Sequence, residues 1–366
     1  MPKTHKSFLI PLQISLLIAV FTIINSRTFP EHWSSRFSTN LIEKYLRSQD
    51  IPKDVKGRVF LSDGEIHTAA GYLYTKGALP TEYNFQHPPF VKYLFGLSAR
   101  FFKTTLPVQF LFSILNIALI YLFSLKLTKS QKISFLSTFL FVLDPLAQGS
   151  LNSTLIDPGQ NFFILLFLYL SLFYPKSYVL QGVSLGLAAA SKFWPPAAFF
   201  AGATFLYRFY KKTLSLKNTL KIISTSALIF TAAYFPIFLK GKGLFYFIWF
   251  QAKVIKYWLN HSVSSLPGNN ILLFTTGFFK SWWGEKEFLR SSTWSPLWPV
   301  SLVFNLIFLW RKTKKKEFDK LFFVSSLPVG YLLYTTIQAP FNRYFLLILP
   351  LGYIIAVKAV YDIIRK

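Results

Sequence analysis

The chain has 366 residues, of which 52% are hydrophobic, 19% are aromatic and only 15% are charged. An average soluble domain is less apolar and more charged, so this composition excludes an ordinary soluble protein. The formal net charge is +26, but many basic residues cluster at the ends of apolar runs, where lipid headgroups lie. We therefore expect a membrane partner and no nucleic acid. Because the chain has no cysteine, disulfides, thiolate chemistry and cysteine metal sites are also excluded.

Apolar runs recur along the chain, and each is about as long as a helix that crosses a bilayer core. They predict an all-α, polytopic membrane protein. The first run follows a basic terminus and has no clear cleavage site, so we expect an anchor helix. The ten predicted spans are residues 8–25, 107–126, 132–148, 159–174, 177–192, 194–209, 219–239, 294–310, 318–337 and 343–363.

One further apolar run, Pro89–Phe102, is short and contains Lys92 and Arg100. A helix of this kind favours the membrane interface over a crossing. Counting it as an eleventh span would move the later basic clusters to the opposite side of the membrane. We therefore predict that it lies along the outer surface.

Ten spans put both termini on one side of the membrane. The basic clusters at residues 126–132, 208–217 and 311–316 fall on that side, which the positive-inside rule assigns to the cytoplasm. The sequence thus predicts a multi-pass protein of the cell membrane with cytoplasmic termini. We expect a single transmembrane domain over residues 1–366, with two long outer segments at 26–106 and 240–293.

The first outer segment contains an unusual concentration of acidic residues. Only 14 residues in the chain are acidic, and seven of them fall between Glu31 and Glu82. Carboxylates gathered beside one face of a bilayer favour chemistry or ion handling. In the ten-span topology, the outer surface gathers a set of ionisable side chains: Asp63, Glu65, His87, Asp157, Lys192, His261 and Arg343.

Several motifs follow one another in this region: Asp63-Gly64-Glu65, His87-Pro88-Pro89-Phe90-Val91-Lys92, Leu143-Asp144-Pro145, Leu155-Ile156-Asp157, Gly186-Leu187-Ala188-Ala189-Ala190-Ser191-Lys192 and Asn342-Arg343-Tyr344. Their order, scattered over roughly residues 60–345, resembles the protein O-mannosyltransferase family, glycosyltransferase family 39. The last motif also resembles the lipid A aminoarabinose transferases. The family carboxylates are adjacent, whereas Gly64 separates Asp63 from Glu65 here.

The resemblance implies a GT-C-type fold and a membrane glycosyltransferase. Such an enzyme transfers a sugar, mannose in this family, from a polyprenyl-phosphate donor to a protein or glycolipid acceptor on the outer face. It implies Asp63 and Glu65 as catalytic residues, without deciding which is the base. The implied substrate-binding residues are His87, Lys92, Asp157, Lys192 and Arg343. No metal ligand or resident cofactor is implied, and dependence on a divalent metal stays open.

The residue types suit this chemistry. A carboxylate can take the proton of an acceptor hydroxyl, and a lysine or arginine can stabilise a phosphate leaving group. Purely structural roles stay open beside these. The carboxylates can be solvated loop acids, Asp157-Pro158 can begin a helix, and Lys192 or Arg343 can anchor to headgroups.

Two other function classes stay open. One is a transporter or flippase, although no inverted repeat or mid-membrane charge is visible in the sequence. The other is an inactive GT-C relative that acts as a binding subunit, which the separated carboxylates allow. The tryptophans at 282, 283, 294 and 298 are expected to anchor the chain at the membrane interface.

Overall fold

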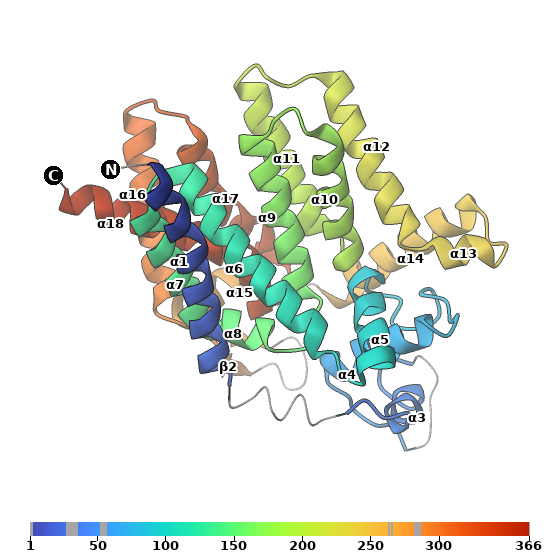
Figure 1. Cartoon of the computed structure of the whole chain (residues 1–366). Helices are drawn as coiled ribbons and strands as arrows, with labels where there is room; N and C mark the ends of the chain where they lie inside the picture. The colour runs from blue at the N-terminus through green and yellow to red at the C-terminus, as the bar shows by residue number, and fades with distance from the viewer. Residues whose placement is uncertain are drawn as a thin grey trace.

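The computed structural model describes residues 3–26, 36–51, 57–262, 264, 266–281 and 287–365. Nearly all of the ordered elements are helices (Figure 1). In this part of the chain the only sheet has two short strands, β1 (Phe278–Lys280) and β2 (Phe288–Arg290), which pair antiparallel with Phe278 opposite Arg290. The predicted all-α fold class is confirmed, and the small hairpin is an addition that the sequence did not indicate.

The helices of the first half form most of the bundle. They are α1 (Lys3–Ile24), α6 (Leu106–Thr128), α7 (Gln131–Leu143), α8 (Pro145–Leu151), α9 (Asp157–Phe173), α10 (Tyr178–Ser191), α11 (Pro195–Tyr210) and α12 (Leu216–Ala232). In this set α10 packs against both α9 and α12, and α6 packs against α7 and α9. The main core consists of large apolar side chains between these helices, because each presents aliphatic and aromatic residues to its neighbours.

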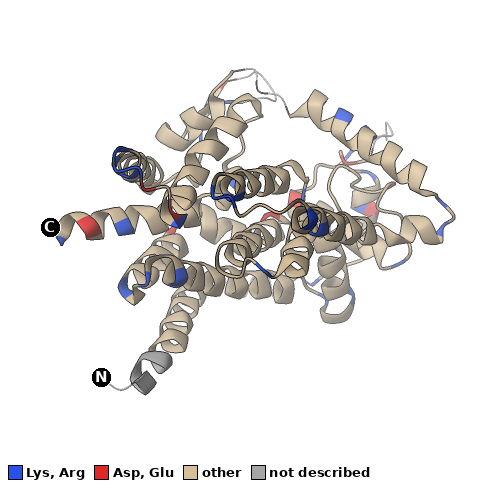
Figure 2. Cartoon of the chain, turned by 90° about the horizontal axis from the view of Figure 1, so that it is seen from above, with Lys and Arg blue, Asp and Glu red and all other residues tan. Residues whose placement is uncertain are grey.

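The C-terminal helices complete the bundle. They are α16 (Leu297–Lys314), α17 (Lys320–Tyr334), the 3-10 helices η1 (Thr335–Ile337) and η2 (Asn342–Leu347), and α18 (Leu349–Ile364). Helix α18 packs against α16 and α7. Viewed from above, the helices are mostly uncharged along their length (Figure 2).

A second layer of helices lies at the right of the bundle and below it in Figure 1. It consists of α3 (Asn40–Leu46), α4 (Asp63–Tyr74), α5 (Phe90–Phe102), α13 (Phe235–Leu239) and α14 (Leu244–His261). Helix α15 (Asn269–Thr276) packs instead against α16, η1 and β1. A small apolar cluster joins α3 to α4, and another joins α13 to α14. The run Pro89–Phe102, which the sequence separates from the spans, is therefore a helix of this layer.

Helices α4 and α5 approach each other closely at two glycines. A Cβ added to Gly71 would lie 2.0 Å from the carbonyl oxygen of Lys92, and one added to Gly96 would lie 2.1 Å from that of Gly71. Only glycine allows backbones to come this near. This contact fixes the position of α4, and with it Asp63, relative to α5 in the second layer.

Three predicted spans differ in detail from the helices observed. The span at 132–148 is broken at Asp144, where α7 ends and α8 continues at an angle of 71°. The span at 219–239 breaks after α12, and the last span begins with η2 before α18 starts at Leu349. Prolines at the first turns of α8, α13 and α18 account for the breaks, since proline suits a helix start and not its interior.

Two helical segments in the described part of the chain are by themselves long and apolar enough to cross a membrane, Leu106–Thr128 and Lys320–Ile337. Taking α7 and α8 together as one bent span adds a third. The ten-span topology and the cytoplasmic termini therefore stay predictions. The loops that follow α6, α11 and α16, which hold the basic clusters, do lie toward one end of the bundle, away from α4 (Figure 1).

Candidate active site

The site begins at the first turn of α4. Ser62 caps this helix, because its hydroxyl accepts a hydrogen bond from the Glu65 N–H at 3.3 Å. The Glu65 carboxylate in turn accepts from the Ser62 N–H at 2.8 Å and from its hydroxyl at 2.7 Å. This reciprocal arrangement is a capping box. The capping box engages the Glu65 side chain. The side chain of Asp63, the first helical residue, takes no part in it.

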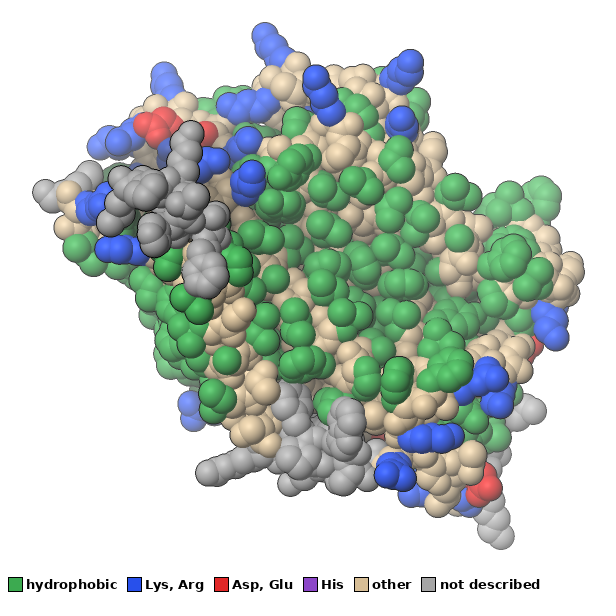
Figure 3. Space-filling view, viewed as in Figure 1, with side chains coloured by type: hydrophobic (Ala, Val, Ile, Leu, Met, Phe, Trp, Pro, Cys, Tyr) green, Lys and Arg blue, Asp and Glu red, His purple; other side chains and the backbone are tan. Residues whose placement is uncertain are grey.

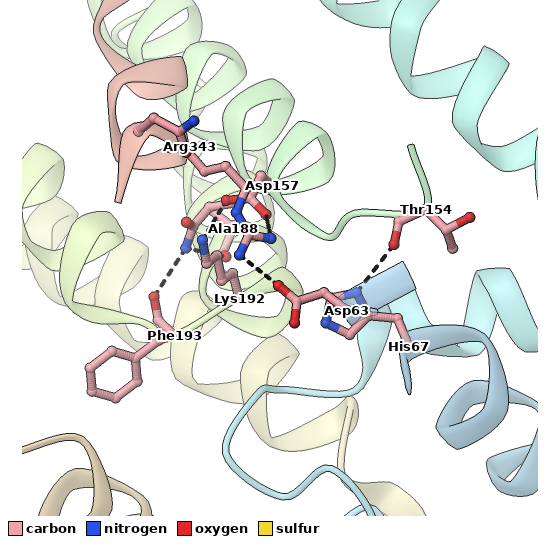
Figure 4. A network of polar contacts seen from close by, with 10 residues as sticks. Asp63, His67, Thr154, Asp157, Ala188, Lys192, Phe193 and Arg343 are labelled. Atoms are coloured by element: carbon pink, nitrogen blue, oxygen red, sulfur yellow. Dashed lines mark hydrogen bonds and ion pairs between the residues drawn. The ribbon is translucent and has the colours of Figure 1, made fainter. Parts of the chain in front are cut away.

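Asp63 belongs to an ion network that joins four chain segments (Figure 4). Its Oδ2 accepts a hydrogen bond of 2.6 Å from Nη2 of Arg343, in η2. The other guanidinium nitrogen, Nη1, lies 3.8 Å from Oδ2 of Asp157, at the start of α9. Oδ1 of Asp157 accepts a hydrogen bond from Nζ of Lys192, which ends α10. Two carboxylates thus alternate with two cations.

Exposure differs sharply across this network. The side chain of Asp157 is only 4% exposed, whereas that of Asp63 is 52% exposed. Helix α9 is capped by backbone at Ile156, so Asp157 does not serve as the helix cap that its proline neighbour allowed. Its buried charge is compensated by Lys192 and Arg343, as a buried carboxylate requires. Asp63 is the carboxylate of the network that a substrate can reach.

Two histidines lie beside the network. Nδ1 of His67 is 3.2 Å from the carbonyl oxygen of Thr154, and its ring meets that of His87 edge-on, with the centroids 5.9 Å apart. The His87 ring also contacts Trp258 of α14, at a centroid distance of 5.2 Å. Nδ1 of His87 is buried and makes no hydrogen bond to any described residue. This unpartnered nitrogen belongs to a residue that lines the apolar cavity described below.

Burial determines the charge of these histidines. It lowers the pKa of His67 to about 4, although the Asp63 carboxylate opposes the shift. It also lowers the pKa of His87 well below the ordinary value, with help from the nearby cations Lys92, Lys192 and Arg343. For Asp63, burial raises the pKa, but the Arg343 guanidinium opposes it, and the pKa lies below the ordinary range. Asp63 is ionised at neutral pH, and both histidines are neutral.

Lys92 lies apart from the ion network. Its amine is fully buried and donates hydrogen bonds to the carbonyl oxygen and Oδ1 of Asn84, at 2.8 and 2.9 Å, and to the carbonyl oxygen of His87, at 2.7 Å. A fourth hydrogen bond reaches the hydroxyl of Tyr74. These contacts hold the loop that carries His87. Lys92 was expected to bind substrate, and the structure instead encloses it in protein.

The ion network separates two hollows. A polar cleft of about 620 Å³ lies on the Asp63 side, between α3, α4 and the loop before α9. An apolar cavity of about 400 Å³ lies on the Lys192 side, and His87, Trp258 and Tyr344 contribute to its wall. A further apolar groove of about 570 Å³ between α10, α11, α12 and α14 shares Trp194 and Ile255 with this cavity. The cavity beside Lys192 and the groove therefore adjoin at these two side chains.

The structure brings Asp63, Asp157, Lys192 and Arg343 together and places His87 beside them. It places Glu65 in the capping box at the edge of the polar cleft. The sequence analysis did not assign four neighbouring residues: His67, Thr154, Trp258 and Tyr344. His67 had a signal, since it lies four residues after Asp63 and therefore on the same helix face. Tyr344 also had one, since it directly follows Arg343 in the Asn342-Arg343-Tyr344 motif. Thr154 and Trp258 come from distant segments and had none.

The expectation that Trp298 anchors the chain at the membrane interface was wrong. It is fully buried, and its indole N–H donates to Oδ2 of Asp144 at 2.8 Å, where the hydroxyl of Tyr353 also donates at 2.6 Å. Asp144 ends the α7 helix and caps α8, so it belongs to this structural cluster. Trp294 is partly buried, and residues 282 and 283 lie outside the described residues. Among the described residues, no three histidines or carboxylates gather as a metal site would require.

Solved structures share this architecture. The crystal structure of ArnT from Cupriavidus metallidurans bound to undecaprenyl phosphate matches with a TM-score of 0.66 and 11% identity, over 98% of this chain and 61% of that one. The oligosaccharyltransferase of Archaeoglobus fulgidus, tethered to an acceptor peptide, matches with a TM-score of 0.58 and 12% identity, over 100% and 51% of the two chains.

Apo ArnT gives a TM-score of 0.53 with 13% identity, over 88% of this chain and 58% of that one. The chain thus spans about half to three fifths of the length of the structures that it matches. No protein-family model and no curated sequence matches it. At these identities the likeness shows the fold, which is that of the GT-C membrane glycosyltransferases.

Proposed function

We propose that this protein transfers a sugar from a polyprenyl-phosphate donor to a hydroxyl-bearing acceptor. The observation that carries the proposal is the ion network, which lies between an apolar cavity and a polar cleft. A lipid-linked donor and a polar acceptor need two such compartments with reactive groups where they meet. The fold likeness to ArnT and to an oligosaccharyltransferase supports the same reaction class.

Asp63 is the general base in this proposal. It is ionised, faces the polar cleft, and is half exposed, whereas Glu65 is engaged in capping α4. When the acceptor hydroxyl gives its proton to Asp63, the hydroxyl oxygen attacks the anomeric carbon of the donor. The bond between that carbon and the phosphate oxygen breaks, and the lipid phosphate leaves with the electron pair.

Lys192 and Arg343 receive the phosphate. Both are cations at the meeting point of the two hollows, and Lys192 lies on the wall of the apolar cavity. Hydrogen bonds from cations to phosphate are strong in a site with little water. The isoprenoid chain then extends through the cavity into the groove beyond Trp194. The unpartnered Nδ1 of His87 is a further contact for the donor.

Donor binding also changes the basicity of Asp63. Arg343 holds Asp63 in the resting arrangement and lowers its pKa, which weakens Asp63 as a base. A phosphate that draws the guanidinium away removes this effect, while burial still raises the pKa. Asp63 therefore becomes a stronger base when the donor is present, and transfer follows donor binding.

The acceptor occupies the polar cleft. Its walls carry several hydroxyl side chains, together with Arg36 and Lys44, beside apolar side chains such as Phe37 and Leu41. Such a lining suits a glycan headgroup or a hydroxyl-bearing peptide segment. Mannose is the sugar that the sequence resemblance implies, and a protein or glycolipid is the acceptor class; both belong to the proposal.

The test uses the purified full chain in detergent with a panel of polyprenyl-phosphate sugars, mannose among them. Mass spectrometry should detect sugar transfer, or donor hydrolysis in the absence of acceptor, in the wild type and not in Asp63→Asn. Donor binding without any turnover across the panel would favour the binding-subunit alternative. Movement of intact donor between the leaflets of a vesicle would favour a flippase.

A further inference from the structure

A second charged pocket lies at the opposite end of the bundle from Asp63, where α16 and α18 end. It has a volume of about 440 Å³. Its rim includes Arg311, Lys314, Lys315 and Arg365, and its wall includes Phe308 and Trp310. This set of six residues is called the basic pocket below. Nothing in the proposed transfer reaction uses it.

The carboxylates around the basic pocket already have partners. Glu317 accepts a hydrogen bond of 2.6 Å from Lys312, and Asp362 accepts one of 2.5 Å from Lys358. Lys312 also lines the pocket, and its charge is balanced by Glu317. Among the described residues, neither carboxylate forms an ion pair with any of the four rim cations named above. In the described part of the chain, the four rim cations make no ion pair. Their charge is therefore unbalanced, which favours an anion in the pocket.

The pocket also has an apolar side. Phe308 is buried at its base, and Trp310 is 64% exposed with the Lys314 ammonium 5.5 Å from its ring centroid. Below Trp310 the exposed side chains of Val300, Val303 and Leu306 follow at intervals of three residues. Residues at this spacing lie along one face of a helix. An apolar track thus leads away from the basic rim along α16.

We propose that the basic pocket binds the phosphate of an anionic phospholipid, with the acyl chains along the exposed face of α16. Cationic pockets between helices at a membrane surface bind such headgroups, and each nearby cation adds to the attraction. Free phosphate shares the headgroup chemistry, but it has no use for the apolar track. The basic side chains stand along the upper edge of the molecule in Figure 3, over the loop between α16 and α17.

The experiment measures lipid retention by native mass spectrometry. The full chain in a neutral detergent is titrated with phosphatidylglycerol, and in parallel with phosphatidylcholine. The test variant is Arg311→Gln with Arg365→Gln. The matched control is Lys211→Gln with Lys212→Gln, which removes two exposed cations from the loop between α11 and α12 at the same end of the bundle. A third arm adds millimolar inorganic phosphate.

The wild type and the control should retain phosphatidylglycerol, and the test variant should bind it about tenfold or more weakly, in line with the loss of two headgroup contacts. Arg311→Lys with Arg365→Lys should restore most of the retention. Equal loss in the test and control variants, or equal retention of phosphatidylcholine, would overturn the proposal. Complete displacement of phosphatidylglycerol by inorganic phosphate would also overturn it, because the pocket would then recognise phosphate alone and not the lipid. Thermal unfolding of each variant in the same detergent identifies any that fail to fold.

Discussion

Arg343 donates a hydrogen bond of 2.6 Å to Asp63 across 280 positions of the sequence. Through its second nitrogen it also lies 3.8 Å from Asp157, so one guanidinium connects the exposed carboxylate to the buried one. A lysine in this position would be a single point charge and would not span both. The pairing keeps Asp63 ionised and, at the same time, unreactive until another anion competes for Arg343.

The first prediction separates the two carboxylates of the α4 turn. Asp63→Asn should lower the rate of sugar transfer by a factor of about a hundred or more, because it removes the general base. Glu65→Gln should keep the rate within a few-fold of wild type, since glutamine can still complete the capping box. Glu65→Ala should instead lower stability by on the order of 1 kcal/mol. Steady-state rates and denaturation midpoints check these outcomes.

A rate for Asp63→Asn close to that of the wild type, with normal donor binding, would remove Asp63 from the reaction. A large loss in Glu65→Gln without loss of stability would transfer the role to Glu65. The two variants therefore decide a question that the separated Asp63-Gly64-Glu65 motif left open.

The second prediction concerns pH. Burial raises the pKa of Asp63, and Arg343 counteracts it, so the pKa should rise when Arg343 is removed. In Arg343→Gln the acid limb of the kcat/KM profile should accordingly move to higher pH. Arg343→Lys should leave this limb near its wild-type position and recover only part of the activity. Arg100→Gln, which removes an exposed cation whose Nη1 donates to the Thr75 carbonyl oxygen, is the control and should leave the profile unchanged.

Donor binding gives an independent readout of the same residue. We expect Arg343→Ala to weaken donor binding and turnover more than Lys192→Ala, because Arg343 contacts both carboxylates and offers two parallel donors. Unchanged donor affinity in Arg343→Ala would identify it as a structural residue, and the phosphate site would then be sought at Lys192.

Much of the site could be predicted because its members are ionisable residues placed at the ends of apolar runs. Each of Asp157, Lys192 and Arg343 begins or ends a hydrophobic segment, so packing the segments into a bundle brings the three residues to the same end of it. The burial of the Lys92 amine could not be predicted in this way. Its partner Asn84 adopts a left-handed conformation, with φ of 42°, and such a local turn decides which carbonyl oxygens face the amine.

The all-α class followed from the length and recurrence of the apolar runs, and the GT-C type from the motif resemblance. The breaks within the spans followed from neither. The span at 132–148 reads as continuous, yet Asp144 caps a new helix and accepts hydrogen bonds from Trp298 and Tyr353. These two partners lie 154 and 209 positions away. A carboxylate in an apolar run indicates a polar cluster only when its partners are known, and the sequence alone does not name them.

The third prediction tests the contact between α4 and α5. Gly71→Ala and Gly96→Ala should each destabilise the protein, by about 1–3 kcal/mol or more, because the new Cβ would lie about 2 Å from a backbone oxygen. Gly149→Ala, where nothing lies within 4 Å of the added Cβ, is the control and should be neutral or slightly stabilising. Equal thermal midpoints for all three variants would contradict the close approach.

The fourth prediction tests the topology. The chain has no cysteine, so single cysteines report without background. Lys76→Cys and Lys240→Cys should react with an impermeant thiol reagent added outside intact cells, whereas Lys211→Cys and Thr313→Cys should react only after permeabilisation. All four positions are exposed. The reverse pattern would invert the orientation and place Asp63 on the cytoplasmic face.

The last prediction concerns Lys92 and the pH dependence of stability. Burial lowers the pKa of its amine to about 7, against an ordinary value of 10.5 in the unfolded chain. Between these two values the unfolded chain binds more protons than the folded one, so the contribution of Lys92 to stability rises with pH. Below pH 7 the amine is charged in both states, and the cost of burying that charge is fully present.

Lys92→Met keeps most of the side-chain volume and removes the titration. The thermal midpoint of the wild type should therefore rise relative to that of Lys92→Met between about pH 7 and 9.5, on the order of a few degrees. Lys76→Met, at an exposed position of the same layer, is the control and should give a curve parallel to wild type. Parallel curves for wild type and Lys92→Met would mean that the buried amine keeps its ordinary pKa. The four oxygen acceptors around it would then stabilise the ammonium as well as water does.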